Sequence, residues 1–215
     1  QFGATASEAA RLAVPSSQDA LLDLYIDEPE AFEHRTPYYG IVWPSAIGLA
    51  GAVGSFVRDG DRCLELGCGL GLGGIAAALS RKPASVLLTD HDAAAARLGR
   101  LNARLSGVAD CVKSNALDWT AIHTWPCAQF DCAFAADIIY EEEACAPVAR
   151  VLAHALRPGG RFLLADGERR MHRARLRTAL GQAFVPLGEQ RVVTVGDRQT
   201  SNVVLTAWER TAHDL

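Results

Sequence analysis

A glycine-rich run between Arg62 and Gly74 constrains what this chain can fold into more than any other feature. It reads RCLELGCGLGLGG. A short apolar segment that ends in an acid and then breaks into alternating glycines predicts a buried strand followed by a tight turn, where missing side chains let the backbone approach a ligand closely. With Gly67 and Gly69 in place, the third glycine of a dinucleotide-binding fingerprint would fall on Leu72, so a pyrophosphate site is not expected. A Walker loop is excluded because no Gly-Lys-Ser or Gly-Lys-Thr follows.

Length and composition indicate one soluble domain. The chain has 215 residues, 49% of them hydrophobic, which is enough for a single core and short for two. No apolar window approaches the roughly 18 residues of a membrane span and no basic-then-apolar leader opens the chain, so we expect a cytoplasmic protein without a membrane partner. Six cysteines without a Cys-x-x-Cys pair and six histidines without ligand spacing indicate reduced core thiols and no metal site. A net charge of -4 is not typical of a nucleic-acid binder.

The hydrophobic patterns along the chain predict an α/β fold. Helices are expected over 44–57, 72–79, 93–105, 141–156 and 168–180. Strands are expected over 62–66, 85–90, 108–113, 129–135, 161–165, 190–195 and 202–208. Five strands separated by helices, then two strands in succession, predict a Rossmann-like doubly wound sheet of seven strands, mostly parallel, with one antiparallel strand from a C-terminal hairpin. We assign 1–37 to an N-terminal arm and short helix, and 38–215 to the domain that carries the motifs.

Carboxylates and aromatic residues follow the predicted strands at the edge where ligands bind in open parallel sheets. Asp90 ends the second strand, where a carboxylate can accept both hydroxyls of a ribose, although a strand-terminal Asp is also common for structural reasons. Asp118 and Trp119 follow the third strand. There a carboxylate can take an adenine amino group and a tryptophan can stack on the base; the alternative is a loop pair that only packs. Asp137 and Tyr140 follow the fourth strand and are expected at the ligand crevice.

Together these motifs resemble the class I, seven-β-strand S-adenosylmethionine methyltransferases, and within them methyltransferase family 16, the branch of protein lysine methyltransferases and nicotinamide N-methyltransferase-like proteins. The resemblance covers about 38–208. It is carried by Gly40-x-x-Trp43, Glu65-x-Gly67-x-Gly69-x-Gly71, Asp90, Asp118-Trp119 and Asp137-x-x-Tyr140. The Trp-Pro-Ser form at Trp43 is closest to the subgroup that methylates lysines of the electron-transfer flavoprotein β subunit, whereas the segment after the fifth strand lacks the proline expected there.

The resemblance implies S-adenosylmethionine as the cofactor. The residues implied to bind it are Trp43, Glu65, Gly67, Cys68, Gly69, Gly71, Asp90, Asp118 and Trp119. Asp137 and Tyr140 are implied to be catalytic, with Asp137 orienting the acceptor nitrogen and Tyr140 closing the pocket around the methyl group. For Trp43, a plain packing role remains the alternative.

Three functions compete at this stage. The first is methylation of a lysine in a protein substrate, and the second is N-methylation of a small heterocyclic amine in the same pocket. The third is a non-catalytic binding module that uses the arginine-rich helix 168–180 on a protein or nucleic acid, although that helix is better explained as a solvated face. Glu65, Asp90 and Asp137 occur together, which argues against the third. The acceptor and the oligomeric state are left open.

Overall fold

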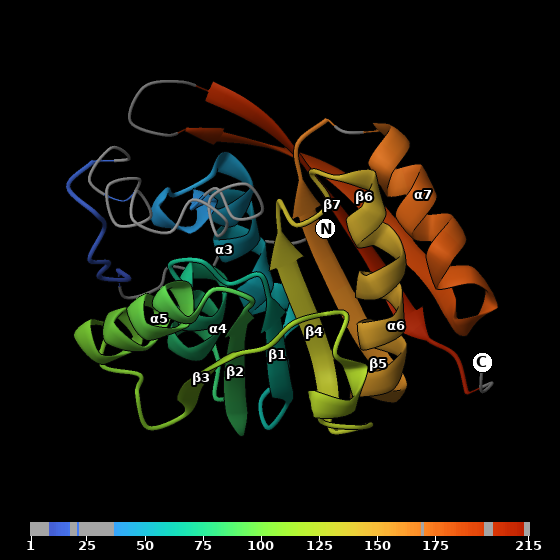
Figure 1. The fold of residues 1–215 in the computed structure, drawn as a ribbon, viewed down its shortest axis with the longest axis horizontal. Helices are drawn as coiled ribbons and strands as arrows, with labels where there is room; N and C mark the ends of the chain where they lie inside the picture. The colour runs from blue at the N-terminus through green and yellow to red at the C-terminus, as the bar shows by residue number, and fades with distance from the viewer. Residues whose placement is uncertain (1–8, 18–20, 22–36, 169, 196–199, 213–215) are drawn as a thin grey trace.

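The computed structural model describes residues 9–17, 21, 37–168, 170–195 and 200–212, which form a three-layered α/β structure around one sheet (Figure 1). The strands are β1 (Arg62–Leu66), β2 (Ser85–Asp90), β3 (Val112–Ala116), β4 (Phe130–Ala136), β5 (Leu156–Asp166), β6 (Phe184–Val195) and β7 (Thr200–Arg210). The α-helices are α3 (Pro44–Phe56), α4 (Leu72–Ser80), α5 (Ala93–Leu105), α6 (Cys145–Ala155) and α7 (Arg170–Leu180). Short 3-10 turns are η1 (Tyr38–Gly40), η2 (Ile122–Thr124), η3 (Glu142–Ala144) and η4 (Gly181–Ala183).

The sheet has the order β3-β2-β1-β4-β5-β7-β6. Strands β1 to β5 are mutually parallel, and β7 runs antiparallel to both of its neighbours. The seven-stranded, mostly parallel sheet with one reversed strand from a C-terminal hairpin is therefore confirmed. Because the chain runs outward from β1 to β3 and then returns to β4, the strand order reverses between β1 and β4, which is where open sheets of this kind bind ligands.

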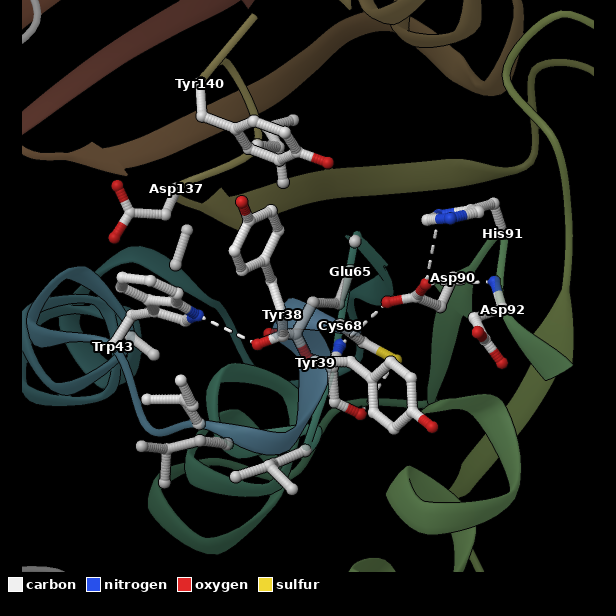
Figure 2. A pocket seen from close by; sticks show the side chains of 18 of the residues that line it. Tyr38, Tyr39, Trp43, Glu65, Cys68, Asp90, His91, Asp92, Asp137 and Tyr140 are labelled. Carbon is white, nitrogen blue, oxygen red and sulfur yellow. Dashed lines mark hydrogen bonds and ion pairs between the residues drawn. The ribbon is translucent and has the colours of Figure 1, made fainter. Parts of the chain in front are cut away.

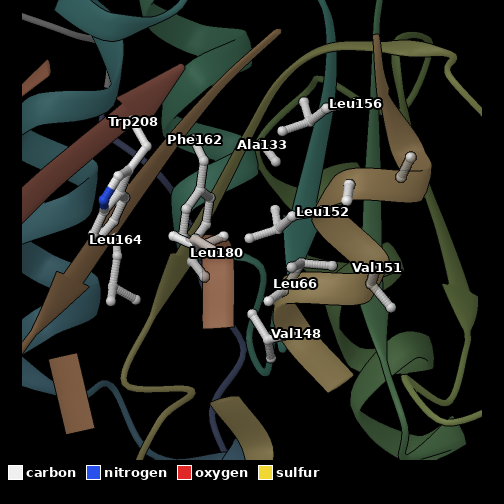
Figure 3. Packing of buried hydrophobic residues seen from close by; sticks show 14 of the residues in the cluster. Leu66, Ala133, Val148, Val151, Leu152, Leu156, Phe162, Leu164, Leu180 and Trp208 are labelled. Carbon is white, nitrogen blue, oxygen red and sulfur yellow. The ribbon is translucent and has the colours of Figure 1, made fainter. Parts of the chain in front are cut away.

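Each face of the sheet is covered by helices that bury a separate apolar core. Helices α3, α4 and α5 contribute to one core, and α6 and α7 to the other. On the second face, Phe162 of β5 pairs with Trp208 of β7, and their rings stack at 5.5 Å between centroids (Figure 3). Leu152 of α6 and Leu180 of α7 belong to the same cluster. Burial on both faces explains why the central strands read as continuous apolar runs.

The third strand was predicted too early in the chain. The prediction was 108–113, whereas β3 spans Val112–Ala116. The intervening segment closes α5 instead: Gly107 adopts a left-handed φ of +73°, and the Val108 amide donates to the Ala103 carbonyl at 2.9 Å. A left-handed glycine followed by an apolar residue that folds back on the last turn is a helix C-cap, which sequence alone does not separate from the start of a strand.

The C-terminal strands are longer than predicted. Strand β6 begins at Phe184 and not at residue 190, and β7 spans Thr200–Arg210 and not 202–208. The start of β6 was missed because residues 185–189 are all exposed and show no alternation in the sequence. The short helix predicted ahead of residue 37 lies mostly outside the described residues. None of the helices in the described part of the chain has the length and apolar character that a bilayer crossing requires.

Candidate active site

A cavity of about 500 Å³ opens at the carboxyl ends of β1, β2 and β4, beside the point where the strand order reverses (Figure 2). This volume is in the range of small-molecule and cofactor sites. Most of the residues predicted for the site line it: Trp43, Glu65, Gly67, Cys68, Gly69, Asp90, Trp119, Asp137 and Tyr140. Segments that are far apart in the sequence thus meet at a single cavity.

The turn after β1 forms one wall of the cavity with bare backbone. Gly67 and Gly69 have φ values of +58° and +49°, a region that residues with side chains rarely adopt. A Cβ atom on Gly67 would lie 2.6 Å from Cγ2 of Ile138, and one on Gly69 would lie 3.2 Å from the carbonyl oxygen of Tyr39. Both positions therefore require glycine for backbone geometry and for close packing.

Asp90 at the end of β2 holds this turn in place. Its Oδ2 accepts a hydrogen bond from the Gly69 amide at 3.0 Å, and its Oδ1 accepts one from the Asp92 amide at 3.1 Å. His91 lies beside it, with Nδ1 3.4 Å from Oδ1. Burial raises the pKa of the Asp90 carboxyl, although the two amide donors oppose that rise. Each carboxylate oxygen has a second lone pair, so Asp90 can also accept hydroxyl donors from a ligand in the cavity.

Glu65 is a second buried acid that lines the cavity. Its side chain is 3% exposed, and its Oε2 accepts a hydrogen bond from the Gly74 amide in α4 at 2.8 Å. Burial raises the pKa of Glu65 from 4.5 to about 8, so the acid is mostly protonated at neutral pH. A cation placed beside it in the cavity would favour the ionised form. Glu65 thus connects β1 and α4 and offers an acceptor for a positively charged group.

The opposite end of the cavity is aromatic and more open. The Trp43 Nε1 donates to the Tyr38 carbonyl oxygen at 3.0 Å. The Tyr38 ring makes edge-on contacts with Trp43 and Tyr140, at centroid distances of 6.0 and 5.7 Å (Figure 2). Tyr38 is 43% exposed and Tyr140 is 45% exposed. Burial of the ring, with Glu141 and Asp90 nearby, raises the pKa of the Tyr140 phenol, which therefore stays protonated at neutral pH.

Asp137 lies at the same end of the cavity and has a left-handed backbone conformation. Its φ is +55°, and among the described residues other than glycine only Ala128 shares a positive φ. The Asp137 amide donates to the Ala165 carbonyl oxygen at 3.0 Å, which ties the turn after β4 to the end of β5. Aspartate tolerates this region better than most residues, and such backbone gathers at functional sites. Figure 2 shows Asp137 beside Trp43, across the cavity from Asp90.

Two of the predicted cofactor residues do not line the cavity. Gly71, with a φ of +79°, packs behind the turn, where an added Cβ would lie 2.9 Å from Cδ1 of Leu88. Asp118 is exposed, and its Oδ1 accepts hydrogen bonds from the Thr120 amide at 2.7 Å and hydroxyl at 2.8 Å. Contacts of Gly71 and Asp118 with the cofactor stay predictions. Trp119 does line the cavity, and its buried Nε1 has no hydrogen-bond acceptor within the described chain.

Sequence reasoning missed several residues that line the cavity. They include Tyr38, Tyr39, Ile41, His91, Asp92 and Ile138. Each lies within three positions of a residue that was singled out, so the available signal was adjacency to a motif. The orientation of η1 toward the turn after β1 depends on tertiary packing, which adjacency does not reveal.

Residues 35–180 match the family model described as lysine methyltransferase. The chain belongs to this family. An electron transfer flavoprotein beta subunit lysine methyltransferase from Danio rerio is 35% identical over 95 residues, which cover 42% of this chain and 36% of that protein. The same-named protein from Xenopus laevis is 34% identical over 92 residues, covering 40% and 35%. The chain therefore spans about a third of the length of these relatives.

Solved structures share the fold at low identity. TrmN from Thermus thermophilus superposes with a TM-score of 0.61 at 22% identity, over 78% of this chain and 52% of that one. A geranyl diphosphate methyltransferase in complex with GPP and sinefungin gives 0.59 at 19% identity, over 77% and 78%. These likenesses concern the fold, which is the Rossmann-like arrangement predicted from the sequence.

The family implies S-adenosylmethionine, and the lining of the cavity fits that cofactor. The two wall glycines leave space that a Cβ would fill. Asp90 and Glu65 place acceptors at separate points of the wall, which suits a ligand with hydroxyls and an ammonium group. Trp119 adds a flat ring to the lining. Hydrogen-bond acceptors beside a flat ring suit a nucleoside joined to an amino acid.

Proposed function

We propose that this protein transfers the methyl group of S-adenosylmethionine to the side-chain nitrogen of a lysine in a protein substrate. The observation that carries the proposal is the family match together with one cavity that has buried acceptors at one end and Asp137 among aromatic rings at the other. The curated relatives are named as lysine methyltransferases of a flavoprotein subunit, which supports a protein acceptor.

In this proposal the cofactor occupies the end of the cavity formed by the turn after β1. Asp90 accepts the ribose hydroxyls, Glu65 and the bare backbone at Gly67 face the methionine part, and Trp119 flanks the base. The burial of the two acids and their hydrogen bonds to backbone amides support these roles. When bound, the cofactor supplies an electrophilic methyl group on a sulfonium.

The remaining task falls to the other end of the cavity. Methyl transfer is an in-line displacement, so the protein has to align a neutral amine and exclude water, without any covalent intermediate. Asp137 accepts a hydrogen bond from the lysine nitrogen and orients it, while Tyr38, Trp43 and Tyr140 enclose its alkyl stem. Tyr140 does not act as a base, because its raised pKa keeps the phenol protonated.

The test is to incubate the protein with methyl-labelled S-adenosylmethionine and a cell lysate, and to separate labelled protein from labelled small molecules. We expect label on lysine residues of a protein, confirmed by mass spectrometry of the digest. Asp137→Asn should abolish most of it. Glu143→Gln makes the same exchange of acid for amide at an exposed position outside the cavity and should leave labelling unchanged. Label confined to small molecules would instead indicate the heterocyclic amine, and no incorporation would contradict both.

A further inference from the structure

An N-terminal segment that precedes the family match lies against helix α5. The segment comprises residues 9–17, whereas the match begins at residue 35. The side chains of Asn102 in α5 and of Ser106 at its C-cap each both accept from and donate to the backbone of this segment. The Arg11 amide donates to Ser106 Oγ, and Ser106 Oγ donates to the Arg11 carbonyl, both at 3.0 Å. The Ala13 amide donates to Asn102 Oδ1 at 2.7 Å, and Asn102 Nδ2 donates to the Ala13 carbonyl at 3.3 Å.

Asn102 also reaches the turn after β1. Its Nδ2 donates to the Leu70 carbonyl oxygen at 2.9 Å. Leu70 follows Gly69, whose amide is held by Asp90 in the wall of the cavity. The Asn102 side chain is fully buried, so its donors and acceptor depend on these partners and not on water. The Asn102 side chain therefore joins the N-terminal segment to the glycine turn that forms one wall of the cavity.

The N-terminal residues also pack against η1, which lines the cavity and is called its roof below. A Cβ on Gly40 in η1 would overlap Cδ1 of Leu21 and would lie 3.1 Å from Cγ of Pro15. Tyr39, the preceding residue of η1, covers Gly69 so closely that a Cβ there would meet its carbonyl oxygen at 3.2 Å. The N-terminal residues thus pack against the roof through Gly40 and bond to the wall through Asn102.

We propose that Asn102 is a positioning residue for the cofactor site, and that it couples the order of residues 9–17 to cofactor binding. The inference rests on the proposed function in taking S-adenosylmethionine, or its demethylated product S-adenosylhomocysteine, as the ligand. Coupling of this kind is reciprocal: a segment held on Asn102 favours the binding-competent turn, and a bound ligand must in turn protect the segment.

Two substitutions separate the parts of this connection. Asn102→Ala removes the hydrogen bonds to both Leu70 and Ala13. We expect S-adenosylhomocysteine to bind about tenfold more weakly, because the buried Leu70 carbonyl and the partly buried Ala13 amide lose their partner. Ala13→Pro removes only the amide that the segment donates and leaves the Leu70 bond in place. We expect S-adenosylhomocysteine to bind about threefold to tenfold more weakly. The double variant with both substitutions should bind it no more weakly than Asn102→Ala alone.

The matched control is Ser114→Ala, which deletes a hydrogen bond to the Ala96 carbonyl in α5 at 2.7 Å without contacting the segment or the turn. It should bind S-adenosylhomocysteine as the wild type does. Calorimetry gives the affinities, and thermal melts establish that each variant is folded.

Hydrogen exchange gives a second reading that does not depend on activity. In the wild-type protein, saturating S-adenosylhomocysteine should slow exchange at the Arg11 and Ala13 amides severalfold, and this protection should be lost in Asn102→Ala. If Asn102→Ala does not fold, Ala13→Pro and the wild-type exchange experiment decide the question. Wild-type affinity in a folded Asn102→Ala or Ala13→Pro variant, or ligand that leaves exchange at these amides unchanged, would overturn the inference alone. A wild-type protein that binds no S-adenosylhomocysteine would overturn the proposed function as well.

Discussion

The two ends of the cavity are built in opposite ways. At the cofactor end, Glu65 and Asp90 are 3% and 5% exposed, and backbone amides hold both side chains. At the acceptor end, Tyr38 and Tyr140 are more than 40% exposed, and the rings meet through edge-on contacts (Figure 2). The first arrangement is held by hydrogen bonds within the chain. The second presents an open aromatic surface.

The proposed function accounts for this difference by what each end would bind. A small cofactor can be enclosed by a turn whose shape is set by local sequence. If the acceptor is a lysine of a protein substrate, as proposed, it has to enter from outside, and exposed residues such as Tyr38 and Tyr140 are suited to receive it. Substitutions at the two ends should therefore affect different steps of the reaction.

The largest effect is expected from Asp137→Ala. Its carboxylate should face the acceptor nitrogen, so the loss of orientation should lower single-turnover methyl transfer at saturating cofactor about 100-fold or more. Affinity for S-adenosylhomocysteine should change by less than about twofold, since a cofactor hydrogen bond is not lost. Rapid-quench labelling and calorimetry on the same preparation measure the two quantities. Comparable losses in both would mean that Asp137 holds the cofactor.

Asp90→Ala should give the opposite pattern. Removing two charge-assisted hydrogen bonds to the ribose should cost about 1.5 to 3 kcal/mol of cofactor affinity. Part of this cost comes from the Gly69 amide, which loses its acceptor in the wall. Asp90→Asn keeps one acceptor oxygen and should lose less. Equal calorimetric affinity in Asp90→Ala and the wild type would remove Asp90 from the cofactor site.

Glu65→Gln tests how the cofactor end depends on pH. Because the pKa of Glu65 is raised to about 8, its contribution to stability is fully present below its ordinary pKa of 4.5 and is lost as the pH rises through the folded-state value. The neutral amide in Glu65→Gln does not titrate. Relative to that variant, the wild-type free energy of unfolding should fall by about 1 to 3 kcal/mol between pH 5 and pH 8. Urea denaturation at several pH values measures this, with Glu143→Gln as the exposed control, and parallel curves for wild type and Glu65→Gln would refute it.

The smallest effect is expected from Tyr140→Phe. The raised pKa of the phenol means that Tyr140 contributes its ring and not a base, so the single-turnover rate should change by less than about threefold. Tyr140→Ala, which also removes the ring contact with Tyr38, should lose more. A large fall in the single-turnover rate of Tyr140→Phe, together with a shifted pH profile, would show that the hydroxyl takes part in the chemistry.

Local sequence was enough to predict the bounds of elements that end at capping or turn-forming residues. Asp92 caps α5 through its side chain, and both this helix and β2 begin and end where predicted. The turn after β1 was readable for the same reason, since its glycines are required by backbone geometry. Where a boundary depended on packing, as between Gly107 and β3, the prediction was displaced.

The parts of the site that depend on distant contacts were not predictable. The role of η1 as a roof arises from contact between Tyr39 and Gly69. The bond between Asn102 and Ala13 joins residues 89 positions apart. Nothing in either local sequence indicates the other, because the contact exists only after α5 has packed beside the turn. The motifs predicted most of the residues that line the cavity, and tertiary structure determined which further residues enclose it.

The central claim, that the acceptor is a lysine, is tested most directly by the pH dependence of methyl transfer in single turnover at saturating cofactor. A lysine with a pKa near 10.4 is neutral in only about 0.04% of molecules at pH 7, and a nearby carboxylate such as Asp137 raises that pKa further. The account predicts a rate that rises about tenfold per pH unit from pH 6 to 8. A heterocyclic nitrogen is already neutral in that range, so a flat profile would contradict lysine as the acceptor.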